Sequence, residues 1–212
     1  MRITKLTPQQ RDKNRINVFV DGVYSFSLDV SQVIDLGVRT DIDYSEDQIK
    51  AIVVESEYGK LYSRALEYSL MRPHSQYELE QYLYKKTRPS RLKDGSLRMG
   101  YSEDSAKRVL DAILAKGYVD DAKFAEYWVN NRRLGKGASM RLIRSELQAK
   151  GVSGSTIDVA INSSDRDDRT ELRKVIEKKS RRYSDKSKFQ QYLVRQGFSY
   201  GDVVDELSAW EG

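Results

Sequence analysis

An internal repeat constrains the fold of this 212-residue chain more than any other feature of its sequence. Eight positions recur with a constant shift of 46 residues, and a third copy lies 64 residues upstream, interrupted by an insertion of 13 residues. The three sets are Ser75, Leu79, Leu83, Gly100, Tyr101, Ser102, Ala106 and Leu110; Ser139, Ile143, Leu147, Gly151, Val152, Ser153, Ile157 and Ile161; and Asp185, Phe189, Leu193, Gly197, Phe198, Ser199, Val203 and Leu207. Repetition at this period is typical of stacked supersecondary units.

Each position of the repeat has a physical role in a helical unit. The first residue is an N-cap type, and apolar residues follow it at four and eight positions on one helix face. A glycine then sits where a helix ends in the left-handed conformation, and a serine caps the next helix. A further helix precedes each unit's first cap, with Ala65, Val129 and Val175 as the best shared column. Each unit is therefore predicted to contain three helices.

The N-terminal part follows a different pattern. Asp21-Gly22 separates two runs rich in Val, Ile and aromatic residues, which predicts a hairpin with a two-residue type I′ turn. The segment 2–6 can add a third strand, since an isolated hairpin is marginal in water. From Ser45, which suits an N-cap, the pattern turns helical, with Ile49 and Ile52 on one face.

These observations predict a mainly α fold: a tandem array of three three-helix repeats, preceded by a small N-terminal antiparallel β-sheet with a short helix. The predicted domains are 1–57, the β-sheet extension with its linking helix; 58–117, the first repeat; 118–163, the second; and 164–212, the third. The insertion in the first repeat, at 87–98, is rich in Pro, Gly and Ser and is predicted to be an exposed basic loop.

Composition excludes much enzyme chemistry. The chain has no cysteine and a single histidine, His74, so it offers no thiolate nucleophile and no Cys/His metal site. A phosphate-binding glycine loop and the spacing of a calcium loop are also missing from the sequence. We therefore expect no catalytic residues, no metal and no cofactor.

The predicted location follows from the apolar content. No run approaches the roughly 18 apolar residues that a membrane span needs, and no apolar signal core follows the first charged residues. We expect a cytoplasmic protein without membrane contact.

Positive charge recurs with the repeat. Residues 1–57 contain seven basic and ten acidic residues, whereas residues 58–117 contain twelve basic and seven acidic ones. Basic residues precede the second helix of each unit, which favours contact with an anionic partner. The alternative is ordinary cations in the last turn of a helix. The candidate contact residues are Arg72, Arg132, Arg133, Lys136, Arg141, Arg144, Lys178, Lys179 and Arg182.

Aromatic residues allow two interpretations. Phe124 and Trp128, four residues apart, are expected to form a core stripe. Tyr82, Tyr84 and Tyr192 stay open between packing and stacking on nucleic-acid bases.

The segment Lys116-Gly117-Tyr118-Val119-Asp120-Asp121-Ala122-Lys123-Phe124-Ala125, followed by Tyr127, Arg132, Gly137, Leu147 and Lys150-Gly151-Val152, resembles the signature of the RecX family of bacterial regulators. The resemblance covers residues 58–211, and the N-terminal strands are similar to the extension of some longer members. The loop at 87–98 departs from the family pattern, in which the helix leads directly to Lys-Gly.

The resemblance implies a non-enzymatic modulator of the RecA recombinase. Such a protein lies in the groove of the RecA filament on single-stranded DNA and usually suppresses ATP hydrolysis and strand exchange, with roles in homologous recombination, DNA repair and the SOS response. An array of helical repeats provides a surface suited to following a filament. We expect a monomer.

A second hypothesis is a nucleic-acid-binding helical repeat module that acts without RecA. Salt dependence distinguishes the two, because direct phosphate contacts make the affinity for naked DNA fall steeply with salt.

Overall fold

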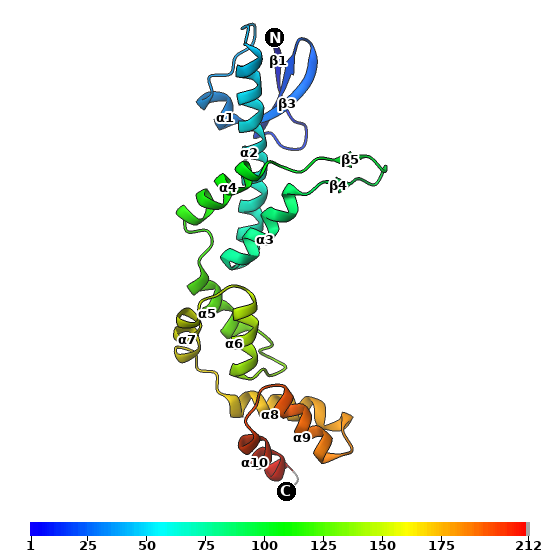
Figure 1. The fold of residues 1–212 in the computed structure, drawn as a ribbon, viewed down its shortest axis with the longest axis vertical. Coiled ribbons are helices and arrows are strands. Elements are labelled where there is room, and N and C mark those ends of the chain that lie inside the picture. Colours follow the sequence, from blue (N-terminus) through cyan, green and yellow to red (C-terminus); the bar gives the residue numbers. More distant parts are fainter. Residues whose placement is uncertain (211–212) are drawn as a thin grey trace. The chain divides into compact units, whose positions relative to one another are not determined.

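The computed structural model describes residues 1–210, and its chain divides into two compact units. The first unit contains residues 1–72 and 79–118, and the second contains residues 73–78 together with the chain from Val119 onward. Figure 1 gives the order of the helices and strands within each unit. Helices dominate both units, and a three-stranded sheet stands at the N-terminus, as predicted.

The sheet is antiparallel, in the order β1 (Ile3–Pro8), β2 (Arg15–Val20) and β3 (Val23–Asp29). Asp21 and Gly22 both have positive φ, 51° and 84°, and Val20 pairs with Val23 across them. This is the predicted type I′ turn, and its backbone twist matches that of the flanking strands. The core of this lobe consists of Ile3, Val18, Phe26, Leu28, Val38, Ile49 and Ile52.

After the short α1 (Val30–Asp35), a single long helix, α2 (Glu46–Met71), leads from the sheet into the first repeat. Ser45 caps it, since its side chain accepts a 3.1 Å hydrogen bond from the amide of Gln48. We expected separate helices on either side of residue 57, but nothing breaks α2 there. Gly59 is buried, and a Cβ at this position would lie 2.5 Å from the Gln32 side chain. Glycine is retained at Gly59 for close packing.

The first unit also contains α3 (Gln76–Thr87) from Leu79 onward and α4 (Glu103–Ala115). The predicted loop at 87–98 is a short antiparallel hairpin of β4 (Ser90–Arg91) and β5 (Leu97–Arg98), and both strands are exposed. The left-handed helix end expected at Gly100 is wrong, because α3 stops before the insertion. Gly100 is instead pressed against the backbone of Thr87, which leaves no room for a Cβ.

The second unit contains two three-helix repeats. The first of them is α5 (Asp121–Asn131), α6 (Met140–Ala149) and α7 (Gly154–Asn162). The other is α8 (Asp168–Lys179), the 3-10 turn η1 (Ser180–Arg182), α9 (Lys186–Arg195) and α10 (Tyr200–Trp210). Each has its own apolar core, one around Phe124, Ile143 and Ile157 and the other around Leu172, Phe189 and Val203.

The helix signals read from the repeat are confirmed. All six predicted caps accept a backbone hydrogen bond through their side chains: Ser75, Ser102, Ser139, Ser153, Asp185 and Ser199. Gly151 and Gly197 end their helices with φ of +80° and +95°. The shared column of Ala65, Val129 and Val175 is buried.

Candidate binding surface

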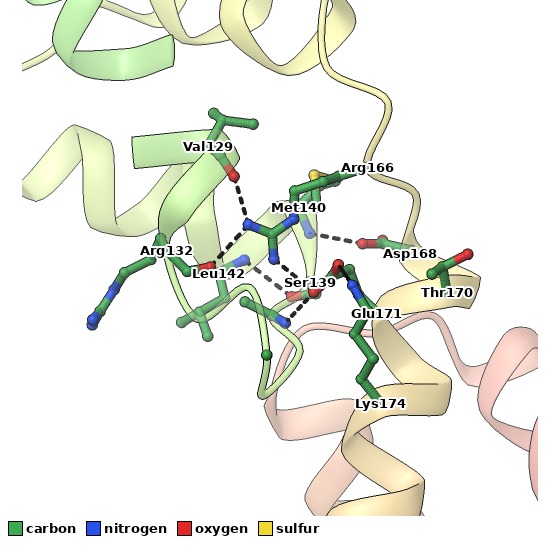
Figure 2. Close-up of polar contacts among 12 residues, drawn as sticks. Val129, Arg132, Ser139, Met140, Leu142, Arg166, Asp168, Thr170, Glu171 and Lys174 are labelled. Atoms are coloured by element: carbon green, nitrogen blue, oxygen red, sulfur yellow. Dashed lines mark hydrogen bonds and ion pairs between the residues drawn. The ribbon is translucent and has the colours of Figure 1, made fainter. Parts of the chain in front are cut away.

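A buried ion pair fixes the loop between α5 and α6, which carries several of the candidate cations (Figure 2). The Arg166 guanidinium donates to the Glu171 carboxylate at 2.6 Å and to the carbonyls of Val129 and Arg132 at 2.5 and 2.8 Å. The amide of Ala138 donates to the same carboxylate at 3.0 Å. Only 7% of the Arg166 side chain and 1% of the Glu171 side chain are exposed. Both ends of the loop are therefore tied to α8.

Two further polar contacts join the same repeats. The Asp168 carboxylate accepts a 2.7 Å hydrogen bond from the amide of Met140 at the start of α6 (Figure 2). The buried Ser139 hydroxyl, which caps α6, also donates to the carbonyl of Gln196 at 2.6 Å. Hydrogen bonds between buried polar groups have strict geometry, so they fix how the second and third repeats meet.

Burial and charge set the pKa values in this network. Burial and the nearby carboxylates of Asp202 and Asp167 raise the pKa of Asp168. Burial also acts to raise the pKa of Glu171, but hydrogen bonds from Arg166 and Lys174 outweigh it and leave that pKa below its ordinary value. Glu171 is therefore the permanent anion of the network.

Arg132, a candidate contact residue, is neutralised within its own repeat. Its guanidinium forms a two-pronged pair with Glu146, at 2.7 and 2.9 Å, and lies 5.0 Å from the ring centre of Trp128. The Trp128 indole donates to the same carboxylate at 3.0 Å. Burial favours a higher pKa for Glu146, but these hydrogen bonds prevail and lower it. This arrangement closes the α5–α6 corner.

Three other candidates also lie apart from a common surface patch. Arg144 is paired with Asp158 on α7. Arg72 follows the end of α2 in the first unit and is half-buried. Arg141 is exposed, and its aliphatic stem lies against the backbone of Gly197, whose Cβ would stand 3.2 Å from that of Arg141.

The structure brings four of the candidate cations together. Arg133 and Arg182 both act electrostatically on the Tyr192 hydroxyl, where they oppose the rise in pKa caused by burial and by Tyr183. The Lys178 ammonium donates to the carbonyl of Gly135, next to Lys136. We call this group, Arg133, Lys136, Lys178 and Arg182, the basic surface; Lys179, half-buried at the end of α8, adjoins it in sequence.

The charge of the basic surface is poorly neutralised. Its nearest printed carboxylate is that of Glu146, 3.7 Å from Arg133 and already paired with Arg132. Between residues 1 and 210, no carboxylate pairs with Lys136 or Arg182. The surface can therefore attract an anionic partner, which the repetition of cations at a shift of 46 residues had suggested.

Aromatic side chains support the basic surface from below. Tyr183 stacks on Phe189 and on Tyr192, with ring centres 4.8 and 5.3 Å apart. Tyr192 is half-buried and packs against the third-repeat core, so packing accounts for its ring. Phe124 is fully buried and Trp128 packs against the same core, which confirms the predicted stripe.

Two residues that organise this region were missed by sequence reasoning. Arg166 and Glu171 lie five positions apart in a segment rich in charged residues, and nothing local distinguishes them from solvated neighbours. A signal existed only in the apolar residues beside Glu171, since Leu172, Val175 and Ile176 place that side of α8 in the core.

The segment that carried the resemblance has structural roles throughout. Gly117 ends α4 with φ of +68°, and the Asp120 carboxylate caps α5 by accepting from two amides at 2.8 and 3.1 Å. Lys150 pairs with Glu78 and lies 4.5 Å from the ring centre of Trp128. The segment therefore specifies the architecture of the repeat.

Other kinds of site have no support in the part of the chain that the structure describes. Residues 1–210 contain no group of three His, Cys, Asp or Glu side chains placed to hold a metal ion. None of the helices described is both long and apolar enough to span a membrane.

The fold and the surface define a tandem three-helix-repeat protein with an N-terminal β-sheet lobe. Two family models match the chain: "Regulatory protein RecX N-terminal domain" over residues 1–43 and "RecX, second three-helix domain" over residues 120–161. The chain belongs to the RecX family of regulatory proteins.

Relatives and solved structures agree with this assignment. The regulatory protein RecX of Bacillus licheniformis is 29% identical over 95% of this chain and 74% of its own length, and that of Clostridium tetani is 29% identical over 98% and 93%. A crystal structure of regulatory protein RecX has a TM-score of 0.63 at 23% identity and covers 95% of this chain and 96% of its own. RecX from Lactobacillus salivarius, at 21% identity, has a TM-score of 0.54 over 73% and 97%. These structures share the fold.

Proposed function

We propose that this chain regulates a RecA-type recombinase by binding the filament that the recombinase forms on single-stranded DNA, and that it slows ATP hydrolysis and strand exchange. Family membership supports the regulatory role. The observation that carries the binding step is the basic surface, where cations from two repeats meet without matching carboxylates. A filament on DNA offers both acidic protein walls and phosphates to such a surface.

Binding requires no chemistry from this chain. A rigid body that occupies a filament groove opposes the rearrangement of the subunits beside it, and the buried Arg166–Glu171 pair supplies rigidity between the second and third repeats. One bound molecule then affects several recombinase subunits. Inhibition below equal stoichiometry is the signature of this mechanism.

The test is the single-stranded-DNA-dependent ATPase rate of RecA from the same organism, titrated with this protein as a monomer concentration. We expect the rate to fall at a small ratio of protein to RecA. The variant Arg133→Gln/Lys136→Gln/Arg182→Gln should need a concentration at least several-fold higher for the same inhibition. Thermal unfolding should match the wild type, because none of the three side chains is buried.

The matched control is Arg11→Gln/Lys13→Gln/Arg39→Gln, which removes the same charge from exposed positions of the N-terminal lobe. It should inhibit like the wild type. Equal inhibition by both triple variants would remove the basic surface from the mechanism. No effect of the wild-type protein at any ratio, with tight and salt-sensitive binding to naked DNA, would instead favour the nucleic-acid module that acts without RecA.

A further inference from the structure

A second group of cations lies in the first unit, apart from every residue of the basic surface. Arg64 on α2 and Arg98 on β5 both donate to the hydroxyl of Tyr101, at 2.8 and 3.3 Å. Their guanidinium groups lie 5.9 and 5.8 Å from the centre of the same ring. Two positive groups thus converge on one neutral acceptor.

Lys60, one helical turn before Arg64, belongs to the same group. Burial and the positive charges of Arg15, Arg64 and Arg98 lower the pKa of Lys60, and only Glu57 acts in the opposite direction. Arg15 has its own counter-ion, Asp29, at 2.8 Å. We call Lys60, Arg64 and Arg98 the cation cluster.

The cation cluster lacks anions of its own. Among residues 1–210, no carboxylate forms an ion pair with any of its three members. Like charges held close together repel, and partial burial strengthens the repulsion because water screens it less. A bound anion would relieve this cost, and guanidinium groups suit phosphate oxygens through paired hydrogen bonds.

The hairpin extends this positive charge away from the helices. Residues 85–98 contain six basic residues and one acidic residue, Asp94. The Asp94 carboxylate is occupied in the turn, where it accepts from the amide and the hydroxyl of Ser96 at 3.0 and 2.6 Å. Figure 1 shows the β4–β5 hairpin projecting from α3 and α4.

The hairpin and the cation cluster form one continuous feature. Arg98 belongs to both, since it lies on β5 and contacts Tyr101 at the base of the hairpin. At the other side of the base, Arg88 stacks on Tyr84, 4.6 Å from the ring centre. A single phosphate would satisfy the cluster alone, whereas cations spread along a projecting hairpin match an anion that repeats along a chain.

We propose that the cation cluster and the β4–β5 hairpin bind the phosphate backbone of a nucleic acid directly. This site deepens the proposed function by giving the chain a DNA contact that needs no recombinase. It rests on that function only for the choice of DNA as the nucleic acid. An acidic protein is the competing partner, and the exposed Leu97 and Met99 are the side chains that such a partner would cover.

The test measures binding of a fluorescently labelled oligonucleotide, as a single strand and as a duplex, by anisotropy at several salt concentrations without RecA. Each lost phosphate contact lowers the slope of log affinity against log salt by about 0.7 on single strands and about 0.9 on duplex. Lys60→Gln/Arg64→Gln/Arg98→Gln should therefore lower the slope by roughly 2 on single strands or roughly 2.7 on duplex. The larger loss identifies the form that the site prefers.

Two control variants make the result specific. Arg11→Gln/Lys13→Gln/Arg39→Gln removes the same charge at exposed positions and should change the slope by less than half as much. Leu97→Ser/Met99→Gln removes the exposed apolar side chains and should leave DNA binding unchanged. Circular dichroism of each variant verifies the fold, and Arg91→Gln/Lys93→Gln, at the exposed end of the hairpin, provides a second test without touching the helices.

The proposal is overturned if the cluster variant binds DNA with wild-type affinity and slope, or if the charge-matched control loses as much. Loss of RecA inhibition in the Leu97/Met99 variant, with wild-type DNA binding in the cluster variant, would assign the hairpin to a protein partner. A wild-type protein that binds DNA through the cluster but never affects RecA would sink the proposed function and leave this inference standing.

Discussion

The guanidinium of Arg166 and the carboxylate of Glu171 form an ion pair of 2.6 Å that is almost entirely removed from solvent. Charges in such a place are costly unless each is paired and hydrogen-bonded. Here the pair also binds the carbonyls of Val129 and Arg132 and the amide of Ala138, so it holds the end of α5 and the following loop to α8. The basic surface depends on this anchor for its geometry.

Glu171→Gln should destabilise the second unit by about 3 to 5 kcal/mol, because it leaves the buried Arg166 charge without its counter-ion. Urea unfolding followed by the fluorescence of Trp128 measures the change. The control Lys50→Gln breaks the Lys50–Glu46 pair, whose side chains are 66% and 67% exposed, and should cost under about 1 kcal/mol. Similar losses in the two variants would contradict the anchoring role.

Acid should destabilise the second unit through Glu171 and Glu146. Both have a pKa below the ordinary value in the folded protein, despite burial that acts to raise it. Their contribution is present above the unfolded pKa of about 4.3 and is lost as pH falls through the lower folded values. Unfolding free energy measured between pH 7 and pH 3 should fall mainly below about pH 4.5.

The Glu146→Gln variant checks this assignment. Its stability should depend less steeply on pH in the acid range than that of the wild type, since one of the two carboxylates no longer titrates. An unchanged acid dependence would show that the Arg132–Glu146 pair contributes nothing to it.

Gly137→Ala should destabilise the loop that carries Lys136 by more than about 1 kcal/mol. Gly137 has φ of +80°, and an added Cβ would lie 2.7 Å from the Val175 side chain and still closer to the carbonyl of Glu171. Gly135→Ala, two residues earlier, meets nothing within 4 Å and serves as the control. Thermal unfolding of both variants measures the difference, and equal melting temperatures would argue against strain at Gly137.

Local rules made much of the fold predictable. The caps at Ser139 and Ser153, the left-handed ends at Gly151 and Gly197 and the turn at Asp21-Gly22 all depend on residues within about four positions, so the sequence displays them directly. The insertion was recognised for the same reason, although its strands were not, because two-residue strands carry almost no periodicity.

The candidate site could be predicted only in part. Recurrence at a shift of 46 residues picked out Arg132 and Arg133 equally, as adjacent cations at the end of one helix. In the folded chain Arg132 is bound to Glu146 and Trp128, while Arg133 faces Tyr192 with Arg182. Adjacent residues on a helix point in different directions, and their partners lie far away along the chain.

The sequence by itself determined the repeats, their helix ends and the N-terminal sheet, because each follows from the conformational preferences of neighbouring residues. Only the tertiary structure decided which cations are neutralised, that Arg166 and Glu171 are buried together, and that Lys60, Arg64 and Arg98 meet around Tyr101. Electrostatic energy depends on distance in space and on exclusion of water, and both are set by packing between segments that the sequence separates.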